Sequence, residues 1–412
     1  MKKLISFLVC VCMLCSFASC GGAPFDVQAE NLMDGIKPNA VTGKHVNDTF
    51  RTAQMAFALE LFQRSVEDAE KENMLISPLS VMLALSMTAN GATGETKAQM
   101  EEVLGLSVKE LNEYLYSYIH SLPSDDKAKF GVANSIWFRD GLEVLPSFLQ
   151  KNADYYGAAA YQSAFDDATV KDINNWVKEN TDGLIEKMLD SIDASTVMYL
   201  INTVLFDAKW QKEYRKDQTR EGFFYAYDGK EQIVDMMYST ENMYLSDEHA
   251  VGVMKPYAGG NYSFAALLPN EGVDVYDYVA LLTCENLLSI LDNAQNREVI
   301  TAIPKFDYAF ELTMNDVLKE MGMELAFQSA GGFGALAKGS DDLYIGEVLH
   351  KSRIVLDEKG TKAAASTMVG MDECASPEET KYVSLNRPFV YMIVDNQTNL
   401  PIFMGVVNQI ER

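Results

Sequence analysis

The chain has 412 residues, 48% of them hydrophobic and 23% charged, which is enough to bury a large core. Its 59 acidic residues outnumber 34 basic residues, giving a formal net charge of −25 at pH 7. This charge repels phosphate backbones, so no nucleic-acid partner is expected, and it leaves the nature of any protein partner open.

The first twenty residues have the composition of an export signal. Two lysines precede an apolar run over residues 4–17, and small residues then lead to Cys20. This order is typical of a signal peptide, and the run is too short to span a membrane comfortably. The ending Phe-Ala-Ser-Cys resembles the bacterial lipobox, in which the cysteine carries lipid. We predict a signal peptide over residues 1–19 and lipidation at Cys20, with an ordinary signal peptide as the alternative.

This ending predicts an exported lipoprotein of a Gram-negative bacterium, anchored to the outer membrane at the cell surface or on the periplasmic face. Of the six cysteines, only Cys284 and Cys374 remain outside the signal and the lipidation site. Two distant thiols do not make a disulfide scaffold, so stability must come from the core. Residues 20–45, rich in Gly, Pro, Asn and Ala, are expected to be a lipid-anchored tether, and residues 46–412 a single domain.

The first elements of this domain are predicted to be helices. Phe50, Phe57 and Leu61 recur at helical spacing. Ser77 followed by proline is a helix start that runs to the Asn-Gly pair at residues 90–91, and a third helix follows Thr93.

The later elements are predicted to be buried strands. Residues 196–206, 389–394 and 402–407 are short apolar runs without alternation, and a polar turn separates the last two. Such runs suit strands that are covered on both faces. The predicted fold class is therefore α+β.

Several motifs in a shared order resemble the serpin family. Residues 383–393, Val-Ser-Leu-Asn-Arg-Pro-Phe-Val-Tyr-Met-Ile, match the family signature, and Ile-Phe-Met-Gly follows at residues 402–405. Further similarities to helix B, helix F and strands 3 and 5 of sheet A lie at residues 76–80, 173–177, 200–203 and 343–351. The resemblance covers roughly residues 47–411. It implies a serpin fold of about nine helices around three β-sheets, with an exposed reactive centre loop at about residues 357–382.

The resemblance also implies a function. A protease cuts the loop of an inhibitory serpin, and the loop then enters sheet A as a new strand while the protease remains covalently attached. We therefore expect a monomeric suicide-substrate inhibitor of serine proteases, or alternatively of cysteine proteases, that needs no cofactor. The competing hypothesis is a non-inhibitory serpin that acts as a binding module.

The residues that resemble the family's hinge suit this movement. They are Glu358, Gly360, Thr361, Ala363, Ala364 and Ala365. In a strand that starts at Thr361, one face carries only small or apolar uncharged residues as far as Met371, and Lys362 points to the other face. A charge on the first face would be costly to bury, and Gly360 supplies backbone freedom. An alanine-rich helix is the rival interpretation of this segment.

Counted from Glu358 at the family's usual spacing, the scissile bond lies between Cys374 and Ala375. A small, weakly polar Cys374 suits the modest primary pocket of an elastase-like enzyme better than a trypsin-like or chymotrypsin-like pocket. Met371 and Glu373 are alternative bait residues. Oxidation of an exposed Cys374 thiol is a further hypothesis about regulation.

Five other residues resemble the parts of the family fold that let sheet A open. Ser77, Ser80, Asn202 and His350 resemble the shutter beneath the sheet, and Trp210 resembles the breach where the loop enters. No histidine has metal-ligand spacing and no G-x-S-x-G motif is present, so neither a metal site nor an enzyme is predicted.

Overall fold

The computed structural model describes residues 27–193, 196–329, 332–339, 343–361 and 379–410. These residues form nine α-helices, two 3-10 helices and sixteen strands, which confirms the α+β class. The helices are α1 (Asp48–Asp68), α2 (Pro78–Ala89), α3 (Gly94–Leu104), α4 (Val108–Ser121), α5 (Pro146–Tyr156), α6 (Asp167–Asn180), α7 (Val275–Leu281), α8 (Cys284–Asp292) and α9 (Asn315–Glu320), with the 3-10 helices η1 (Lys216–Gln218) and η2 (Glu324–Phe327).

The predicted helices and strands are present with small shifts at their ends. In α2, Ser77 is the N-cap and its Oγ accepts a hydrogen bond from the Ser80 N–H at 3.3 Å, with Pro78 at the first helical position. The helix ends at Ala89, one residue before the predicted Asn-Gly pair. All twelve of its residues are buried, because it crosses beneath a sheet.

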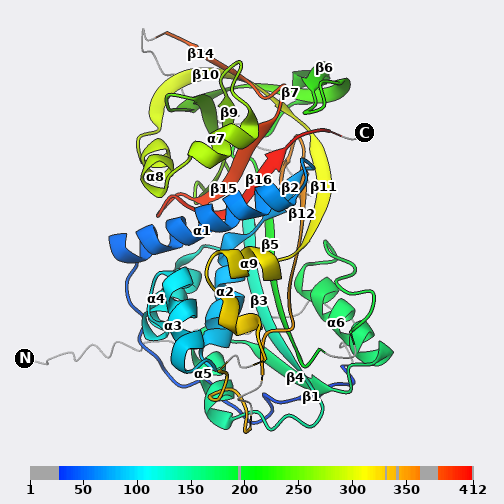
Figure 1. The fold of residues 1–412 in the computed structure, drawn as a ribbon. Coiled ribbons are helices and arrows are strands. Elements are labelled where there is room, and N and C mark those ends of the chain that lie inside the picture. Colours follow the sequence, from blue (N-terminus) through cyan, green and yellow to red (C-terminus); the bar gives the residue numbers. More distant parts are fainter. Residues whose placement is uncertain (1–26, 194–195, 330–331, 340–342, 362–378, 411–412) are drawn as a thin grey trace, which may run out of the picture.

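A seven-stranded sheet forms the lower part of the molecule in Figure 1. Its order is β1 (Glu30–Asn31), β4 (Ala159–Ser163), β3 (Ala128–Arg139), β5 (Met198–Lys209), β13 (Gly360–Thr361), β12 (Glu347–Leu356) and β11 (Phe306–Thr313). The strand β13 therefore lies between β12, which directly precedes it in the chain, and β5, which is about 150 residues away.

A nine-stranded sheet forms the upper part. Its order is β14 (Lys381–Ser384), β10 (Gln295–Pro304), β7 (Glu231–Ser246), β8 (Ala250–Pro256), β9 (Tyr262–Pro269), β15 (Phe389–Asp395), β16 (Leu400–Val407) and β2 (Met74–Ile76), and β6 (Thr219–Tyr225) pairs with β7. Three sheets were expected. In the described part, hydrogen bonds join the strands into two, because the 16-residue β7 pairs with β6 over residues 231–237, with β10 over residues 236–244 and with β8 over residues 243–246.

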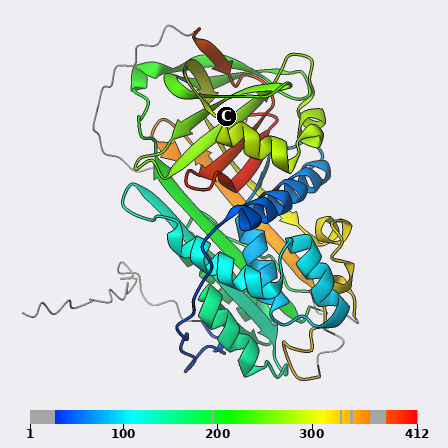
Figure 2. The same ribbon diagram turned by 90° about the vertical axis from the view of Figure 1, so that its left-hand side faces the viewer.

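The seven-stranded sheet separates two hydrophobic cores. On one face, α6 packs through Ile173 and Trp176 against Trp137 of β3 and Ile201 of β5. On the other face lies the larger core, which α1 and α2 share with the nine-stranded sheet. Figure 2 shows α1 lying across the middle of the elongated molecule, between the upper sheet and the lower helices. The middle of the seven-stranded sheet is thus covered on both sides.

Residues 27–45, which belong to the predicted tether over residues 20–45, lie along the body. The strand β1 pairs with β4, and the backbone N–H groups of Gln28 and Ala29 donate to Asp172 Oδ2 at 2.8 and 3.0 Å. These contacts use the backbone, so they leave no periodic pattern in the sequence. The predicted signal peptide and Cys20 lie outside the described residues, and no described helix is both long and apolar enough to cross a membrane.

Candidate functional site

The seven-stranded sheet is open in its middle, between β5 and β12. The two strands pair in parallel only at one end, where Glu347 is opposite Tyr199 and Val348 is opposite Leu200. Over residues 201–207 of β5 and 349–355 of β12, which are all described, they do not pair with each other. The edges of this opening therefore offer backbone groups to a further strand.

A short piece of such a strand already occupies the other end of the opening. Gly360 and Thr361 form β13, which is antiparallel to both neighbours, with Gly360 opposite Lys209, and Thr361 opposite Ala208 and Leu356. Thr361 is only 4% exposed, so it faces inward as the sequence register predicts. Gly360 has φ +153°, and a Cβ atom there would lie 2.0 Å from the Ala208 carbonyl oxygen. Only glycine fits this close approach.

The breach around Trp210 holds the hinge segment, residues 357–361, in place. The Trp210 N–H donates to the Lys359 carbonyl at 2.7 Å, and the Trp210 Nε1–H donates to the Asp357 carbonyl at 2.9 Å. The Tyr257 ring stacks on Trp210 with centroids 4.6 Å apart, and its hydroxyl lies 2.6 Å from the Thr361 hydroxyl. Backbone and side chain of the hinge are thus both anchored.

Two ion pairs support the breach. Lys305 pairs with Glu358 at 3.0 Å at the start of the hinge segment. Deeper in the fold, buried Lys255 pairs with Glu241 at 2.6 Å, and its ammonium group lies 5.3 Å from the Trp210 ring centroid. Burial lowers the pKa of Lys255, and the Glu241 carboxylate opposes that shift. The ammonium group therefore depends on Glu241 as its counter-ion.

The predicted shutter residues meet beneath the opening and hold its two edges separately. On the β12 side, His350 Nε2 accepts a hydrogen bond from the Ser77 N–H at 3.2 Å, and Ser77 Oγ donates to the Ile402 carbonyl at 2.9 Å. On the β5 side, the Ser80 hydroxyl donates to Asn202, whose amide donates to Asn134 of β3. The first turn of α2 therefore contacts both edges.

This arrangement keeps the His350 imidazole neutral. The ring is buried, and burial lowers its pKa from 6.5 to about 4. Because Nε2 accepts the Ser77 N–H, that nitrogen carries no proton. The role of His350 is thus that of a polar spacer that fixes β12 to α2, and it is not placed for acid–base chemistry.

A narrow apolar cavity lies beside Thr361, with room for about one water molecule. Val204 and Phe206 of β5 line one side, and Ile354 of β12 lines the other. Apart from Thr361 and Arg353, whose guanidinium group pairs with Asp307, the lining of this cavity is apolar, which suits small apolar side chains.

Several predicted site residues lie outside the described residues, so the structure does not bear on them: Ala363, Ala364, Ala365, Met371, Glu373, Cys374 and Ala375. Other residues of the site were missed by the sequence reasoning, namely Asn134, Tyr257, Lys305, Lys255 and Glu241. No local motif marks them, because each acts through a partner more than ten residues away in the chain.

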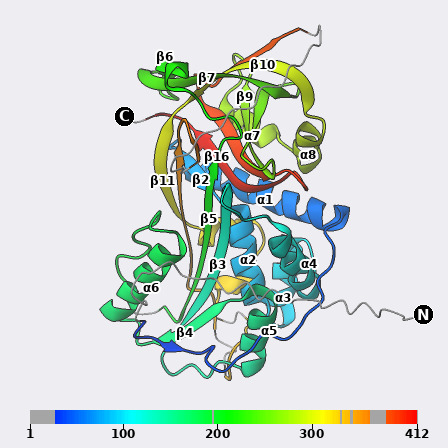
Figure 3. The same cartoon turned by 180° about the vertical axis from the view of Figure 1, so that it is seen from behind.

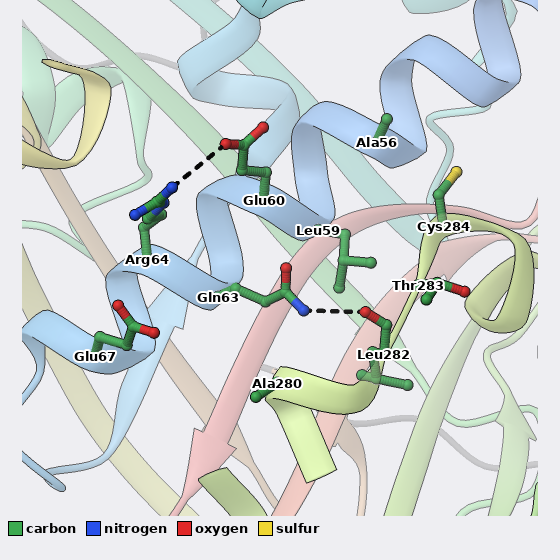
Figure 4. A pocket seen from close by; sticks show the side chains of 10 residues that line it. All are labelled: Ala56, Leu59, Glu60, Gln63, Arg64, Glu67, Ala280, Leu282, Thr283 and Cys284. Atoms are coloured by element: carbon green, nitrogen blue, oxygen red, sulfur yellow. Dashed lines mark hydrogen bonds and ion pairs between the residues drawn. The ribbon is translucent and has the colours of Figure 1, made fainter. Parts of the chain in front are cut away.

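A hollow of about 530 Å³ lies elsewhere, between α1 and the turn that joins α7 to α8 (Figure 4). Gln63 crosses it and donates to the carbonyls of Val279 and Leu282, and Arg64 pairs with Glu60. It contains none of the predicted site residues. Within the described ranges, no group of three or more His, Cys, Asp or Glu side chains is arranged to hold a metal ion.

These features define an α+β protein whose central sheet is open and holds the beginning of an additional strand. The family model described as "Serpin (serine protease inhibitor)" matches residues 52–410. The chain therefore belongs to the serpin family, whose members are mostly protease inhibitors and generally not enzymes.

Individual relatives agree with this assignment. Human alpha-1-antichymotrypsin is 30% identical, with 92% of this chain and 91% of the relative covered. Mouse leukocyte elastase inhibitor A is 29% identical, with 86% of this chain and 98% of the relative covered. The crystal structure of the thermophilic serpin tengpin in the native state has a TM-score of 0.88 and 47% identity, covering 93% of this chain and all of tengpin.

Proposed function

We propose that this protein is an inhibitory serpin that traps serine proteases by loop cleavage, acyl-enzyme formation and strand insertion. The observation that carries the proposal is the opening between β5 and β12, in which Gly360 and Thr361 already pair as β13. A strand that continues from Thr361 would meet unpaired edges on both sides. Thr361, the first residue of this strand to point inward, has a small and uncharged side chain.

The energy available is sufficient for the proposed work. Filling the opening would add roughly a dozen ladder hydrogen bonds at about 1 kcal/mol each, or on the order of 10 kcal/mol. This is comparable to the whole stability of an ordinary domain. Displacing the catalytic groups of an attached protease by only about 1 Å costs orders of magnitude in rate, so the acyl-enzyme would persist.

Elastase-like serine proteases are the proposed targets, with cleavage between Cys374 and Ala375. The small Cys374 side chain supports this choice. The name of the mouse relative, an elastase inhibitor, supports it independently. Met371 and Glu373 are the alternative bait residues.

Denaturing gel electrophoresis after mixing with neutrophil or pancreatic elastase tests the proposal. We expect a higher-mass band that resists detergent, and mass spectrometry should find a released C-terminal peptide that begins at Ala375. A peptide beginning at residue 372 or 374 would identify Met371 or Glu373 as the bait instead. Cleavage without the high-mass band by every elastase, trypsin and chymotrypsin type tested would refute inhibition of serine proteases.

The matched variants Thr361→Arg and Thr361→Ala separate trapping from cleavage. Arginine at this inward position would bury an unpaired charge and block insertion, so the loop should be cut without a stable complex. Alanine should preserve trapping. Cleavage should also raise the melting temperature of the wild type but not of Thr361→Arg, whereas a non-inhibitory binding module would gain no stability in either form.

We propose further that Cys20 carries the lipid that anchors the protein to the outer membrane. The support is the lipobox-like ending of the apolar run. Labelling of expressing cells with a fatty-acid analogue should mark the wild type and leave Cys20→Ala unlabelled. Equal labelling of both would overturn the anchor.

A further inference from the structure

Three large apolar side chains form an exposed patch on the β6–β7 hairpin. Phe223, Tyr225 and Ile233 are 52, 45 and 50% exposed, among the highest values for large apolar side chains in the described residues. Phe223 lies directly opposite Ile233 in the antiparallel pair, so the two side chains are adjacent on one face. The hairpin stands at the outer edge of the upper sheet in Figures 1 and 3.

The patch lies on the same face of β7 as the residues that support the breach. Alternation places Ile233, Ser239 and Glu241 on the same face of β7. Ser239 Oγ lies 3.3 Å from Tyr214 Oη, and Glu241 holds the Lys255 that lies beside Trp210. That face is therefore buried at the breach and exposed at the hairpin.

A single residue connects the patch to the hinge. The Lys305 N–H donates to the carbonyl of Asp235 on β7 at 2.9 Å, and the Lys305 ammonium group pairs with Glu358. Asp235 is only two residues from Ile233 in the strand. The patch is therefore connected through Lys305 to Glu358, at the start of the hinge segment.

Three exposed carboxylates share the face of the hairpin that carries the patch. Glu221, Glu231 and Asp235 are all exposed, and Glu221 lies directly opposite Asp235, so two carboxylates stand side by side next to the apolar rings. A partner that brings basic groups around an apolar centre would complement both features.

Size decides whether a protease on the loop could reach the patch. A protease of about 220 residues has a radius of gyration of about 17 Å and a diameter of roughly 44 Å. Ile233 and Ser239 are six strand residues apart, or about 20 Å. A protease bound next to the breach, where the described hinge segment ends, is therefore wide enough to cover the hairpin.

We propose that the patch of Phe223, Tyr225 and Ile233, with its rim of Glu221, Glu231 and Asp235, is a second docking surface for a target protease with a basic surface. This inference rests on the proposed function. The surface adds affinity and rate before the loop is cut, and it selects among proteases whose primary pockets are similar. Two other occupants fit less well, because a second copy of this chain and an anionic lipid surface would both bring negative charge to an acidic rim.

Two measurements with neutrophil elastase, an elastase of basic surface, test the surface. The first is equilibrium binding of an elastase whose nucleophilic serine is replaced by alanine, which can dock but cannot form the acyl-enzyme. The second is the rate constant of covalent complex formation with active elastase. Phe223→Thr/Ile233→Thr should weaken binding and slow the rate by about tenfold or more, because buried aromatic anchors carry much of the energy of an interface. Threonine preserves the strand preference.

Ile300→Thr is the matched control. Ile300 is also exposed, on the neighbouring strand β10, but its partner Thr240 places it on the opposite face of the sheet. It should leave both measurements unchanged. Glu221→Gln/Asp235→Asn should slow complex formation and reduce its dependence on salt. Thermal unfolding verifies that every variant is folded.

The outcomes separate this proposal from the proposed function. Normal covalent trapping with equal binding of the wild type and the hairpin variant would overturn the docking surface alone. Absence of any covalent complex would overturn inhibition, and the inactive elastase would still decide whether the hairpin binds. Failure of that elastase to bind the wild type would overturn the docking surface. A change in sedimentation when the hairpin is mutated would also overturn it, because the occupant would then be a second copy of this chain. A change in vesicle binding would do the same, because the occupant would then be a lipid surface.

Discussion

The hydroxyl oxygens of Tyr257 and Thr361 lie 2.6 Å apart within the buried breach. Tyr257 also stacks on Trp210, which binds the hinge backbone at two points. The first inward side chain of the hinge is thus held by a hydrogen bond that does not depend on the ladder of the sheet. The hinge is docked before any cleavage occurs.

Removing this hydrogen bond should weaken the docking without disturbing the aromatic stack. We expect Tyr257→Phe to lower the free energy of unfolding by about 1 kcal/mol, because a buried hydroxyl loses its partner while the ring remains. Urea unfolding of Tyr257→Phe, Thr361→Val and the double variant gives the coupling between the two residues. Fully additive losses would show that the two hydroxyl groups do not interact.

The strand β13 should not tolerate a side chain at Gly360. A Cβ atom there would lie 2.0 Å from the Ala208 oxygen and 2.7 Å from the Lys209 Cα, both of which are backbone atoms. Gly360→Ala should therefore release the hinge. The backbone N–H of Trp210, which donates to the Lys359 carbonyl in the wild type, should then exchange with solvent at least about tenfold faster.

Gly141→Ala is the control for that experiment. Gly141 also has a positive φ, of +91°, but an added Cβ atom would have no neighbour within 4 Å. It should cost some stability through backbone strain without changing exchange at Trp210. Unchanged exchange in Gly360→Ala would mean that the hinge stays docked in spite of the contact.

Local sequence signals predicted the elements of this fold well. The Ser77-Pro78 start of α2 and the apolar runs of β5, β15 and β16 follow from caps and composition. Alternation also gave the inward direction of Thr361. These features depend on near neighbours in the chain, so a single sequence contains them.

Contacts between distant segments were not predictable in the same way. Asn134 joins the shutter only because β3 pairs with β5, and Tyr257 reaches Thr361 across 104 positions. Residues 27–45 are held in part by backbone groups, which leave no side-chain pattern in the sequence, and in part by scattered apolar side chains such as Leu32 and Ile36. The shutter and breach residues themselves came from resemblance to a family and not from spacing.

The ion pair between Lys305 and Glu358 should make stability depend on pH in the acid range. Partial burial favours the neutral carboxyl group, but hydrogen bonds and the Lys305 charge outweigh it and hold the pKa of Glu358 below 4.5. A carboxyl group with a lowered pKa stabilises the fold above its unfolded pKa, and this contribution disappears as the pH falls through the folded pKa.

Glu358→Gln should therefore be less stable than the wild type at pH 7, by up to about 1 kcal/mol for a partly exposed pair, and the difference should shrink below pH 4.5. Chemical unfolding at pH 7 and at pH 3 measures both values. Lys305→Met should reproduce the loss at pH 7. A difference that stays constant between the two pH values would exclude the carboxylate as its source.

His350 should add a second pH dependence of the same sign, which begins at a higher pH. Burial lowers its pKa to about 4 from 6.5, so between these values the unfolded chain binds a proton that the folded protein does not. Stability is then complete above pH 6.5 and decreases as the pH falls, by about 2 kcal/mol at pH 5. His350→Gln retains an acceptor for the Ser77 N–H and should abolish this decrease. At pH 8 both side chains are neutral, so the difference in the free energy of unfolding there measures the cost of repacking. The change in this free energy from pH 8 to pH 5 measures the contribution of protonation. If the variant loses as much stability as the wild type over that interval, another group carries the pH dependence and the shutter histidine is not buried in solution.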